Sequence, residues 1–314
     1  MTSSPSLMRR SILAASTLIA VLAMLLTACG SSSSDDAAGS GDPYTVEHAM
    51  GTTELPGVPA RIVVLDSPHL DALVALGITP VGAPEVRVGQ GFPAYLADKL
   101  ADTEPVGGIA EPDIDAIANL APDLIIGAKV RHEAIYDQLT AIAPTVFSEN
   151  SGTDWTEQAT ITAAAVNQSG RMAELLRALD ERAVEVGNKV GAKGTTASIV
   201  RFRPDNFRLY GPQTFSGSLL TTMGFDLGDR DWNEYSMMEL SPELYEQIDG
   251  DVAFYMSPGG DADASSQKTI TALWSGIPSV KANKAFEVED DTWMVGIGVI
   301  GAGLVLDQVE DKLA

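Results

Sequence analysis

Cysteine is almost absent from this sequence, since Cys29 is the only one among 314 residues. A lone cysteine forms no internal disulfide and provides no thiolate cluster for a structural metal. Histidine is nearly as scarce: His48, His69 and His132 are the only three, and no two stand at metal-ligand spacing. We therefore expect no metal centre built from the protein's own side chains, and no cofactor.

Positive charge is scarce as well, because 20 lysines and arginines face 43 aspartates and glutamates, for a formal net charge of −23. A chain of this charge repels the phosphates of nucleic acids and the headgroups of acidic lipids. No nucleic acid is expected as a partner, and no basic patch is expected to hold the protein on a membrane.

The signatures of common enzymes are missing. There is no Gly-x-Ser-x-Gly elbow and no glycine-rich run that fits a phosphate-binding loop. The stretch "GIGVIG" (296–301) matches Gly-x-Gly-x-x-Gly, but no apolar strand precedes it, so we interpret its glycines as helix-packing residues. We therefore expect a protein that is not an enzyme.

The beginning of the chain has the features of an export signal. Arg9 and Arg10 precede an apolar run (11–28) that is long enough to span a membrane, and Cys29 follows it. The stretch "LTAC" (26–29) resembles the lipobox of bacterial lipoprotein signal peptides. That resemblance implies cleavage before the cysteine and a lipid on its thiol. The alternative is an ordinary secretory signal with a cysteine beside the cut.

We accordingly predict a signal peptide over 1–28, and a lipidated cysteine with a flexible tether over 29–43. The stretch "GSSSSDDAAGSGD" (30–42) contains no residue able to pack a core. Loss of Arg9 and Arg10 leaves 18 basic and 43 acidic residues, a net charge of −25. The mature protein is expected at the cell membrane, lipid-anchored and facing outside the cytoplasm.

Strand and helix patterns alternate along residues 44–153. Short apolar runs such as "PARIVVLD" (59–66) and "PDLIIGA" (122–128) predict buried strands. Apolar residues at helical spacing follow them at 70–77, 112–120 and 131–143. This alternation predicts an N-terminal α/β lobe in which a mostly parallel sheet carries helices on both faces.

Residues 154–190 have a different composition, without proline and rich in Ala, Leu, Glu and Arg. Asp154 and Glu157 form a capping-box pattern, which predicts a helix that begins at Asp154. A second helix of about 20 residues would span roughly 30 Å, enough to run from one lobe into another. The strand and helix rhythm restarts over 191–314, which predicts a C-terminal α/β lobe with one of its helices at 241–248.

The order of these segments resembles the substrate-binding lipoproteins of iron–siderophore ABC importers, in the ferric-siderophore and cobalamin class of solute-binding proteins. The resemblance rests on the lipobox, the Ser-rich tether, "PARIVVLD…LDALVALGITPVGA" and the long mid-chain helix. It is densest in "GGIAEPDIDAIANLAPDLIIGAKVRHEAIYDQLTAIAPTVF" (107–147), and "VRFRPDNFRLYG" (200–211) strengthens the siderophore branch.

This resemblance implies the class III fold, an α/β architecture with two Rossmann-like lobes and mostly parallel sheets joined by one long helix. It implies a ferric siderophore held between the lobes, with no direct contact between the protein and the iron. It also implies delivery to the permease subunits of an ABC importer in the membrane. The protein itself is expected to be a monomer.

Arginines are the expected ligand contacts. Arg131 follows a predicted strand and begins a helix, so it lies at the carboxyl edge of a sheet, where open α/β folds bind ligands. The resemblance implies that Arg131 contacts the siderophore. From the other lobe, Arg201 and Arg203 are expected to share one strand face, because side chains alternate with period two. Alternatively, Arg131 lies in solvent or pairs with Glu133, and one arginine of the second pair binds an acid such as Asp205.

Three aromatic side chains complete the predicted binding site. Tyr210 offers a hydroxyl group, and Trp232 and Trp293 are candidate walls, since tryptophan combines a large apolar surface with one donor. Two acids are expected outside the site: the resemblance implies that Asp115 and Glu243 dock the two lobes onto arginines of the permease.

Two cations that occur in members of the family are missing from this sequence. Trp293 is followed by "VGIG" without an arginine, and "IAEP" (109–112) stands where some members carry an arginine before "TEP". Fewer cations favour a less anionic ligand, so a hydroxamate chelate is slightly preferred to a tris-catecholate. Haem or cobalamin on the same fold is the alternative, with His69 and His132 as candidate axial ligands. A third hypothesis for the function is a lipid-anchored hydrolase or siderophore esterase.

Overall fold

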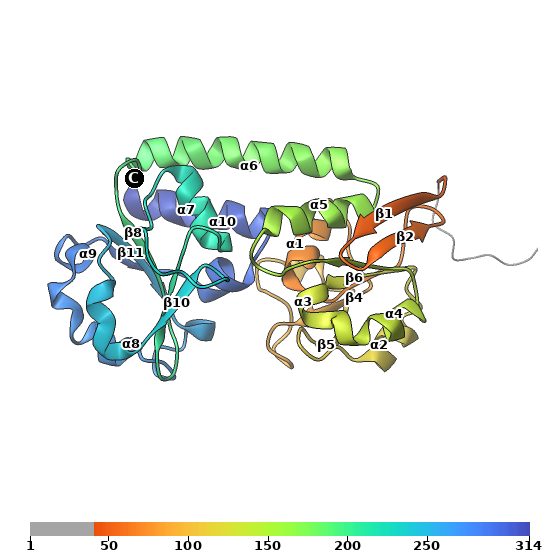
Figure 1. The fold of residues 1–314 in the computed structure, drawn as a ribbon, viewed down its shortest axis with the longest axis horizontal. Coiled ribbons are helices and arrows are strands. Elements are labelled where there is room, and N and C mark those ends of the chain that lie inside the picture. The colour runs from red at the N-terminus through yellow and green to blue at the C-terminus, as the bar shows by residue number, and fades with distance from the viewer. Residues whose placement is uncertain (1–40) are drawn as a thin grey trace, which may run out of the picture. The chain divides into compact units, whose positions relative to one another are not determined.

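The computed structural model describes residues 41–314, which build two α/β lobes (Figure 1). The predicted signal peptide (1–28), Cys29 and most of the predicted tether lie outside the described residues. No helix within residues 41–314 has the length and apolar character needed to cross a membrane.

The N-terminal lobe contains a five-stranded sheet whose neighbouring strands are all parallel. The strands run in the order β5 (Glu104–Gly108), β4 (Gly82–Glu85), β3 (Ile62–Val64), β6 (Leu124–Ala128) and β7 (Thr145–Ser148). A hairpin of β1 (Tyr44–His48) and β2 (Gly51–Leu55) precedes the sheet. The helical elements are α1 (Ser67–Ala75), η1 (Ala97–Lys99), α2 (Ile114–Asn119), α3 (Lys129–His132), η2 (Glu133–Ile135) and α4 (Tyr136–Thr140).

Helices cover both faces of this sheet, as the continuous apolar strands predict. Ile62 and Val64 pack into a core with α1, whereas Val63 and Leu65 pack into a second core with α2 and α4. Side chains alternate between the two faces of a strand, so a strand that is apolar at every position must be buried on both.

The C-terminal lobe has a mixed sheet in the order β10-β9-β8-β11-β12. β8 (Ala197–Phe202), β11 (Val252–Met256) and β12 (Ala285–Glu287) are parallel, whereas β9 (Phe207–Tyr210) and β10 (Met237–Leu240) pair antiparallel at one edge. The helical elements are α7 (Phe215–Met223), η3 (Pro242–Gln247), η4 (Pro258–Gly260), α8 (Gln267–Thr271), η5 (Trp274–Gly276), α9 (Pro278–Lys281), η6 (Asp291–Val295) and α10 (Val299–Leu313).

Two helix predictions need correction. The segment at 241–248 forms the 3₁₀ element η3, and Leu244 departs from helical geometry inside it. Asp154 precedes α5 (Trp155–Ala165) as expected, but its backbone is left-handed, with φ 54°, and its side chain makes no capping hydrogen bond. The short polar side chain of aspartate tolerates this left-handed position.

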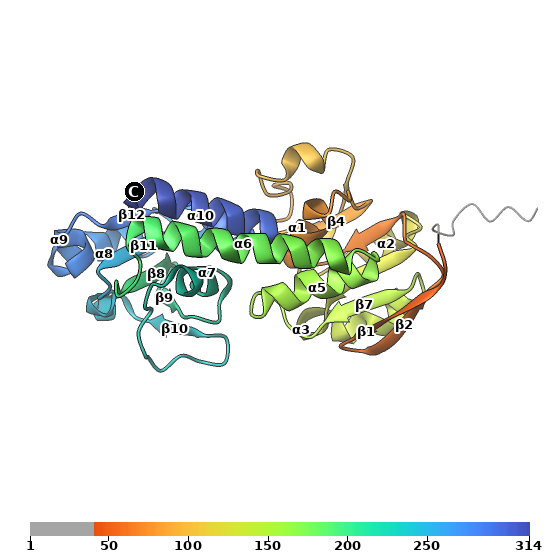
Figure 2. The same cartoon turned by 90° about the horizontal axis from the view of Figure 1, so that it is seen from above.

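The long helix expected in the middle of the chain is α6 (Ser169–Val190), with 22 residues. It lies along α5 in the first lobe and along α7 and α10 in the second (Figures 1 and 2). Gly187 lets α6 approach α7 closely, since a Cβ atom there would lie 1.9 Å from the Met223 carbonyl oxygen. Gly191 ends the helix in the left-handed conformation, at φ 69°.

Asp71 ties the two lobes together. Its carboxylate, on α1 of the first lobe, accepts the backbone N–H groups of Ile300 (2.9 Å) and Gly301 (3.0 Å) at the start of α10. The Tyr95 hydroxyl donates a third hydrogen bond at 3.1 Å. Gly298 allows this approach, because a Cβ atom there would lie 2.4 Å from Asp71. The "GIGVIG" glycines are therefore packing residues, as the sequence predicted.

The buried position of Asp71 makes stability depend on pH. Burial raises the pKa of the Asp71 carboxyl from 3.8 to about 6, although the three hydrogen bonds oppose the shift. Because the folded-state pKa is the higher one, folding favours the protonated form. The contribution of this proton to stability is complete below about pH 4 and is lost as pH rises through about 6.

We expect Asp71→Asn, which carries no titratable group at this site, to remove that dependence. The free energy of unfolding of the wild type, relative to the variant, should fall by about 2.4 kcal/mol between pH 4 and pH 7. Urea denaturation of both proteins across this range measures the difference. A difference that does not change with pH would contradict the assignment.

Candidate functional site

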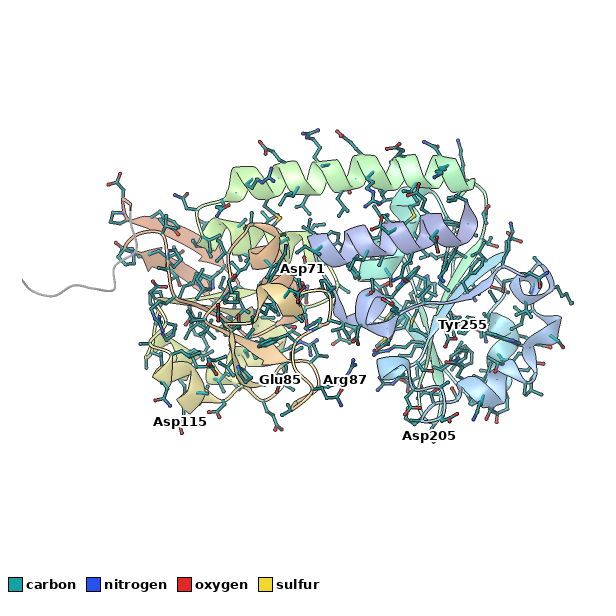
Figure 3. All side chains as sticks on the ribbon, turned by 180° about the vertical axis from the view of Figure 1, so that it is seen from behind. Asp71, Glu85, Arg87, Asp115, Asp205 and Tyr255 are labelled. Carbon is teal, nitrogen blue, oxygen red and sulfur yellow. The ribbon has the colours of Figure 1, made fainter. Side chains whose placement is uncertain are left out.

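The carboxyl ends of the two sheets face a common region between the lobes. The segment that follows β4 in the first lobe contacts the segment that follows β12 in the second, where an Arg87 Nη atom donates to the Asp291 carboxylate. A hollow of about 180 Å³ lies at this contact, between Arg87 and Phe92 on one side and Asp291 and Val295 on the other. Figure 3 shows Arg87 on the side of the first lobe that faces the second. Open α/β sheets bind ligands at such strand ends, so the candidate site lies here.

Arg131 stands at this edge of the first lobe. Strand β6 ends at Ala128, and Arg131 lies in the short helix α3 that follows. Its Nε donates to Asp66 Oδ2 at 2.9 Å, and the Asp66 side chain is 3% exposed against 42% for Arg131. A hollow of about 380 Å³ opens beside it, lined by Lys129, Val130, Arg131, Glu133, Ala134, Glu149 and Asn150. The guanidinium is thus fixed on one side and accessible on the other.

Arg201 lies at the corresponding edge of the second lobe, near the end of β8. Its Nη2 donates to Asp290 Oδ2 at 2.9 Å. Its Nε lies 2.6 Å from Asp290 Oδ1, but the two atoms are too poorly aligned for a hydrogen bond and interact as an ion pair. The acid that pairs with Arg201 is therefore Asp290, and the suggested partner Asp205 is not involved.

Arg203 differs from Arg201 in its surroundings. Strand β8 ends at Phe202, so the period-two argument that placed both arginines on one strand face does not apply. The Arg203 backbone N–H donates to Asn206 O at 2.8 Å and forms a tight turn into β9. Among the arginines of residues 41–314, it alone has a guanidinium with no ion pair and no hydrogen bond to the described residues. Its donors are available to a ligand.

Two of the three predicted aromatic residues keep partial exposure. Tyr210 is half-buried at the end of β9. Trp232 is half-buried in the loop before β10, where its ring packs over Gly211 and the Arg230 guanidinium carbon lies 5.9 Å from the ring centre. Both have surface that a ligand can contact.

The expectation that Trp293 lines the site is wrong. Its side chain is 0% exposed and stacks on Phe254, with the ring centres 4.8 Å apart. Its Nε1 donates to Gln308 Oε1 at 3.0 Å, so even its polar atom is occupied inside the lobe. The π-helical turn η6 directs this tryptophan into the core, and the sequence contains no signal for that turn.

The two histidines considered as haem ligands are structural. His69 is buried, with Nδ1 2.8 Å from Thr162 Oγ1 and Nε2 3.2 Å from Ser148 Oγ. His132 is also buried, with Nδ1 accepting the Ala128 N–H and Nε2 2.8 Å from Ile109 O. Burial lowers the pKa of His69 to about 4 and also lowers the pKa of His132. All four ring nitrogens are engaged within the protein, which leaves none for an axial bond.

The two predicted docking acids lie on the surface, one in each lobe. Asp115 is exposed in the first turn of α2, and Figure 3 shows it at the rim of the first lobe, away from α6. Glu243 is fully exposed in η3, where hydrogen bonds from its own backbone and from Ser241 lower the pKa of its carboxyl.

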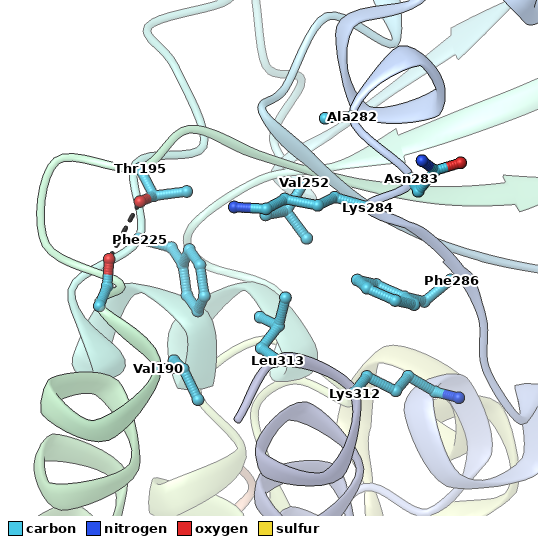
Figure 4. Close-up of a pocket in the computed structure, with 11 residues that line it drawn as sticks. Val190, Thr195, Phe225, Val252, Ala282, Asn283, Lys284, Phe286, Lys312 and Leu313 are labelled. Carbon is cyan, nitrogen blue, oxygen red and sulfur yellow. Dashed lines mark hydrogen bonds between the residues drawn. The ribbon is translucent and has the colours of Figure 1, made fainter.

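Another hollow, of about 350 Å³, lies in the second lobe (Figure 4). Val252, at the start of β11, forms part of its wall together with Val190 and Leu313 at the ends of α6 and α10. It therefore sits at the amino ends of the parallel strands, opposite the edge that carries the arginines. Its size alone does not make it the candidate site.

Sequence reasoning missed the carboxylates that hold the arginines. Asp66 lies two residues after the apolar strand β3, and an acid in that position is a signal that could have identified it. Asp290 belongs to the acidic run "EVEDD" (287–291), where nothing in the pattern distinguishes it from its solvated neighbours. No group of three or more His, Cys, Asp or Glu side chains within residues 41–314 is placed to hold a metal ion.

Comparison with known proteins agrees with this geometry. The chain is 39% identical over 303 residues to the probable siderophore-binding lipoprotein YfiY of Bacillus subtilis, covering 91% of this chain and 93% of that one. It is 31% identical over 294 residues to the Fe(3+)-citrate-binding protein YfmC of the same organism, covering 88% of this chain and 90% of the relative. The predicted resemblance to iron-uptake binding proteins is confirmed.

Solved structures extend the similarity to the fold. The crystal structure of Staphylococcus aureus SirA complexed with staphyloferrin B superposes with a TM-score of 0.77 at 28% identity, covering 86% of this chain and 98% of that one. The expected class III architecture of two lobes joined by a long helix is confirmed. A family model described as periplasmic binding protein matches residues 62–292. The chain therefore belongs to the periplasmic binding protein family.

Proposed function

We propose that this protein captures a ferric siderophore in the region between its lobes and delivers it to an ABC importer. The observation that carries the proposal is the pair of arginines, Arg131 and Arg203, which offer donors from the carboxyl edges of opposite lobes. The names of relatives support the ligand class, since YfiY is described as siderophore-binding and SirA was crystallised with staphyloferrin B. The protein acts as a monomer, anchored outside the cytoplasm by a lipid on Cys29.

The arginines suit the outer surface of such a complex. A siderophore surrounds Fe(III) with its own oxygens, so the protein binds those oxygens and leaves the iron untouched. A guanidinium presents several donors in one plane and keeps its charge at every physiological pH. Because the Arg201 guanidinium is paired with Asp290, we assign the direct ligand contact in the second lobe to Arg203. Tyr210 and Trp232 remain proposed contacts, but they do not adjoin Arg203. Strand β9 runs antiparallel to β8, so Tyr210 lies toward the start of β8, and Trp232 donates to Gly228 O on that side of the lobe.

The charges around the site favour a chelate of low net charge. Arg131 is paired with Asp66, Arg201 with Asp290, and Lys129 with Glu149 at 3.0 Å. Most positive charge at the strand ends is therefore neutralised within the protein. This supports a hydroxamate chelate over a tris-catecholate.

A carboxylate chelate is the second candidate. Two relatives at 31% and 30% identity are described as binding Fe(3+)-citrate and Fe(3+) dicitrate. Haem has no comparable support, because the ring nitrogens of His69 and His132 are engaged inside the lobe.

We expect ferric chelates, but not their iron-free forms, to quench tryptophan fluorescence of the mature protein in a titration across hydroxamate, carboxylate and catecholate classes. Arg131→Ala should bind the preferred chelate at least about tenfold more weakly, since a hydrogen bond to a charged group contributes roughly 1.5–3 kcal/mol. Arg177→Ala is the matched control, because Arg177 is a surface arginine paired with Glu181 on α6. Equal affinity of Arg131→Ala and wild type would remove Arg131 from the site.

The docking role of Asp115 and Glu243 has its own test. With the partner permease in proteoliposomes, the double variant Asp115→Ala/Glu243→Ala should lose at least about tenfold in stimulated ATPase activity while it keeps its affinity for the chelate. Asp137→Ala/Glu246→Ala, with two other exposed acids of the same lobes, is the control. Equal losses in both double variants would show that the effect is one of net charge, not of docking.

A further inference from the structure

Four charged side chains from both lobes meet at the mouth of the site, and we call them the Asp290 cluster: Arg87, Arg201, Asp290 and Asp291. Asp290 accepts from Arg201 and from the Gly259 backbone N–H at 3.0 Å. An Arg87 Nη1 atom, from the other lobe, lies 3.9 Å from Asp290 Oδ2, while Arg87 Nη2 bonds to Asp291. One carboxylate of the second lobe therefore faces guanidiniums of both lobes.

The first lobe brings Arg87 to this position on a pre-shaped loop. The Glu85 carboxylate at the end of β4 accepts the N–H groups of Gly89 (2.8 Å) and Gly91 (2.7 Å). Both glycines are left-handed, with φ near +80°, a conformation that other residues rarely adopt. Arg87 Nε donates to Gln90 Oε1 at 3.1 Å, and this hydrogen bond within the loop helps to orient the Arg87 side chain toward the second lobe.

Burial distinguishes Asp290 from the other members of the cluster. Its side chain is 1% exposed, compared with 16% for Arg201, 33% for Arg87 and 40% for Asp291. Water screens a buried charge poorly, so Asp290 acts on both guanidiniums more strongly than an exposed carboxylate would. Two carboxylates and two guanidiniums also leave the cluster without net charge. The positive charge of Arg201 and Arg87 is thereby withheld from a ligand.

We propose that Asp290 determines which ferric chelates the protein accepts. By holding Arg201 and attracting Arg87, it keeps the mouth of the site near neutral and so disfavours strongly anionic complexes relative to neutral ones. Asp290 touches no ligand in this proposal and acts through the two arginines. The inference rests on the proposed function and adds to it a selection by ligand charge.

The test compares two probes, a neutral ferric trihydroxamate and a ferric tris-catecholate, which is strongly negative. In Asp290→Asn the two guanidiniums lose their shared counter-charge. The ratio of the two dissociation constants should shift at least about tenfold in favour of the anionic chelate. A role confined to folding would weaken both chelates together and leave the ratio unchanged.

Asp307→Asn is the matched control. Asp307 also pairs with an arginine, Arg182, but this pair joins α10 to α6 and contacts no proposed site residue. This substitution changes the net charge equally, so it should alter the ratio by less than about twofold. A shift as large as that of Asp290→Asn would assign the effect to total charge and overturn the inference.

Arg87→Gln provides a second variant on an exposed loop, which avoids a substitution in the interior. Removing this cation leaves the two acids in excess, so the ratio should move at least about threefold toward the neutral chelate. Opposite shifts in Arg87→Gln and Asp290→Asn support the proposal, and unchanged ratios in both overturn it. If the wild type binds no ferric chelate of the hydroxamate, carboxylate or catecholate class, the proposed function itself fails, and this inference fails with it. Binding of an anionic ferric carboxylate alone keeps the proposed function and overturns this inference.

Discussion

The site depends on one repeated interaction, in which a nearly buried aspartate holds an arginine at the carboxyl edge of a sheet. Asp66 does this for Arg131 in the first lobe, and Asp290 does it for Arg201 in the second. Each pair places a guanidinium at a defined point without exposing an unpaired charge inside the lobe, which would be costly. In a chain with 43 acidic residues, such pairing also decides where the remaining positive charge is offered. At the carboxyl edges of the two sheets, the positive charge left for a ligand is that of Arg203 and of the accessible side of Arg131.

The second constraint is the rigidity of the connection between the lobes. Helix α6 packs along elements of both lobes, Asp71 binds the start of α10, and the loop that carries Arg87 reaches Asp291. These contacts fix the spacing of the arginines before any ligand arrives. A preformed site loses less conformational entropy on binding, so more of the interaction energy is expressed as affinity. The same contacts explain why Gly187, against Met223, and Gly298, against Asp71, cannot carry a side chain.

Much of the architecture could be predicted from the sequence, because it follows from periodicity. Apolar runs such as Ile62–Val64 must be buried on both faces, and the segment around α6 has helical composition without proline. The position of Arg131 followed from the strand that precedes it. Partners of charged residues were harder, since an acid that pairs with an arginine comes from a distant part of the chain. Asp66 and Arg131 are separated by 65 positions, and Arg201 and Asp290 by 89.

The failures share a physical cause. Trp293 was expected at the ligand because tryptophan combines a large apolar surface with one donor, but a π-helical turn points it into the core. Arg203 was expected on a strand that ends one residue earlier, and its available guanidinium results from that ending. In each case the outcome depends on local backbone geometry, which composition and spacing do not encode.

A crystal structure of residues 41–314 with a ferric chelate bound tests the central claim most directly. The account predicts iron between the carboxyl edges of the two sheets, with guanidinium nitrogens of Arg131 and Arg203 about 3 Å from chelate oxygens and Arg201 still on Asp290. A chelate found at the amino edge of the second lobe, in the hollow between Val252 and Leu313, would contradict it.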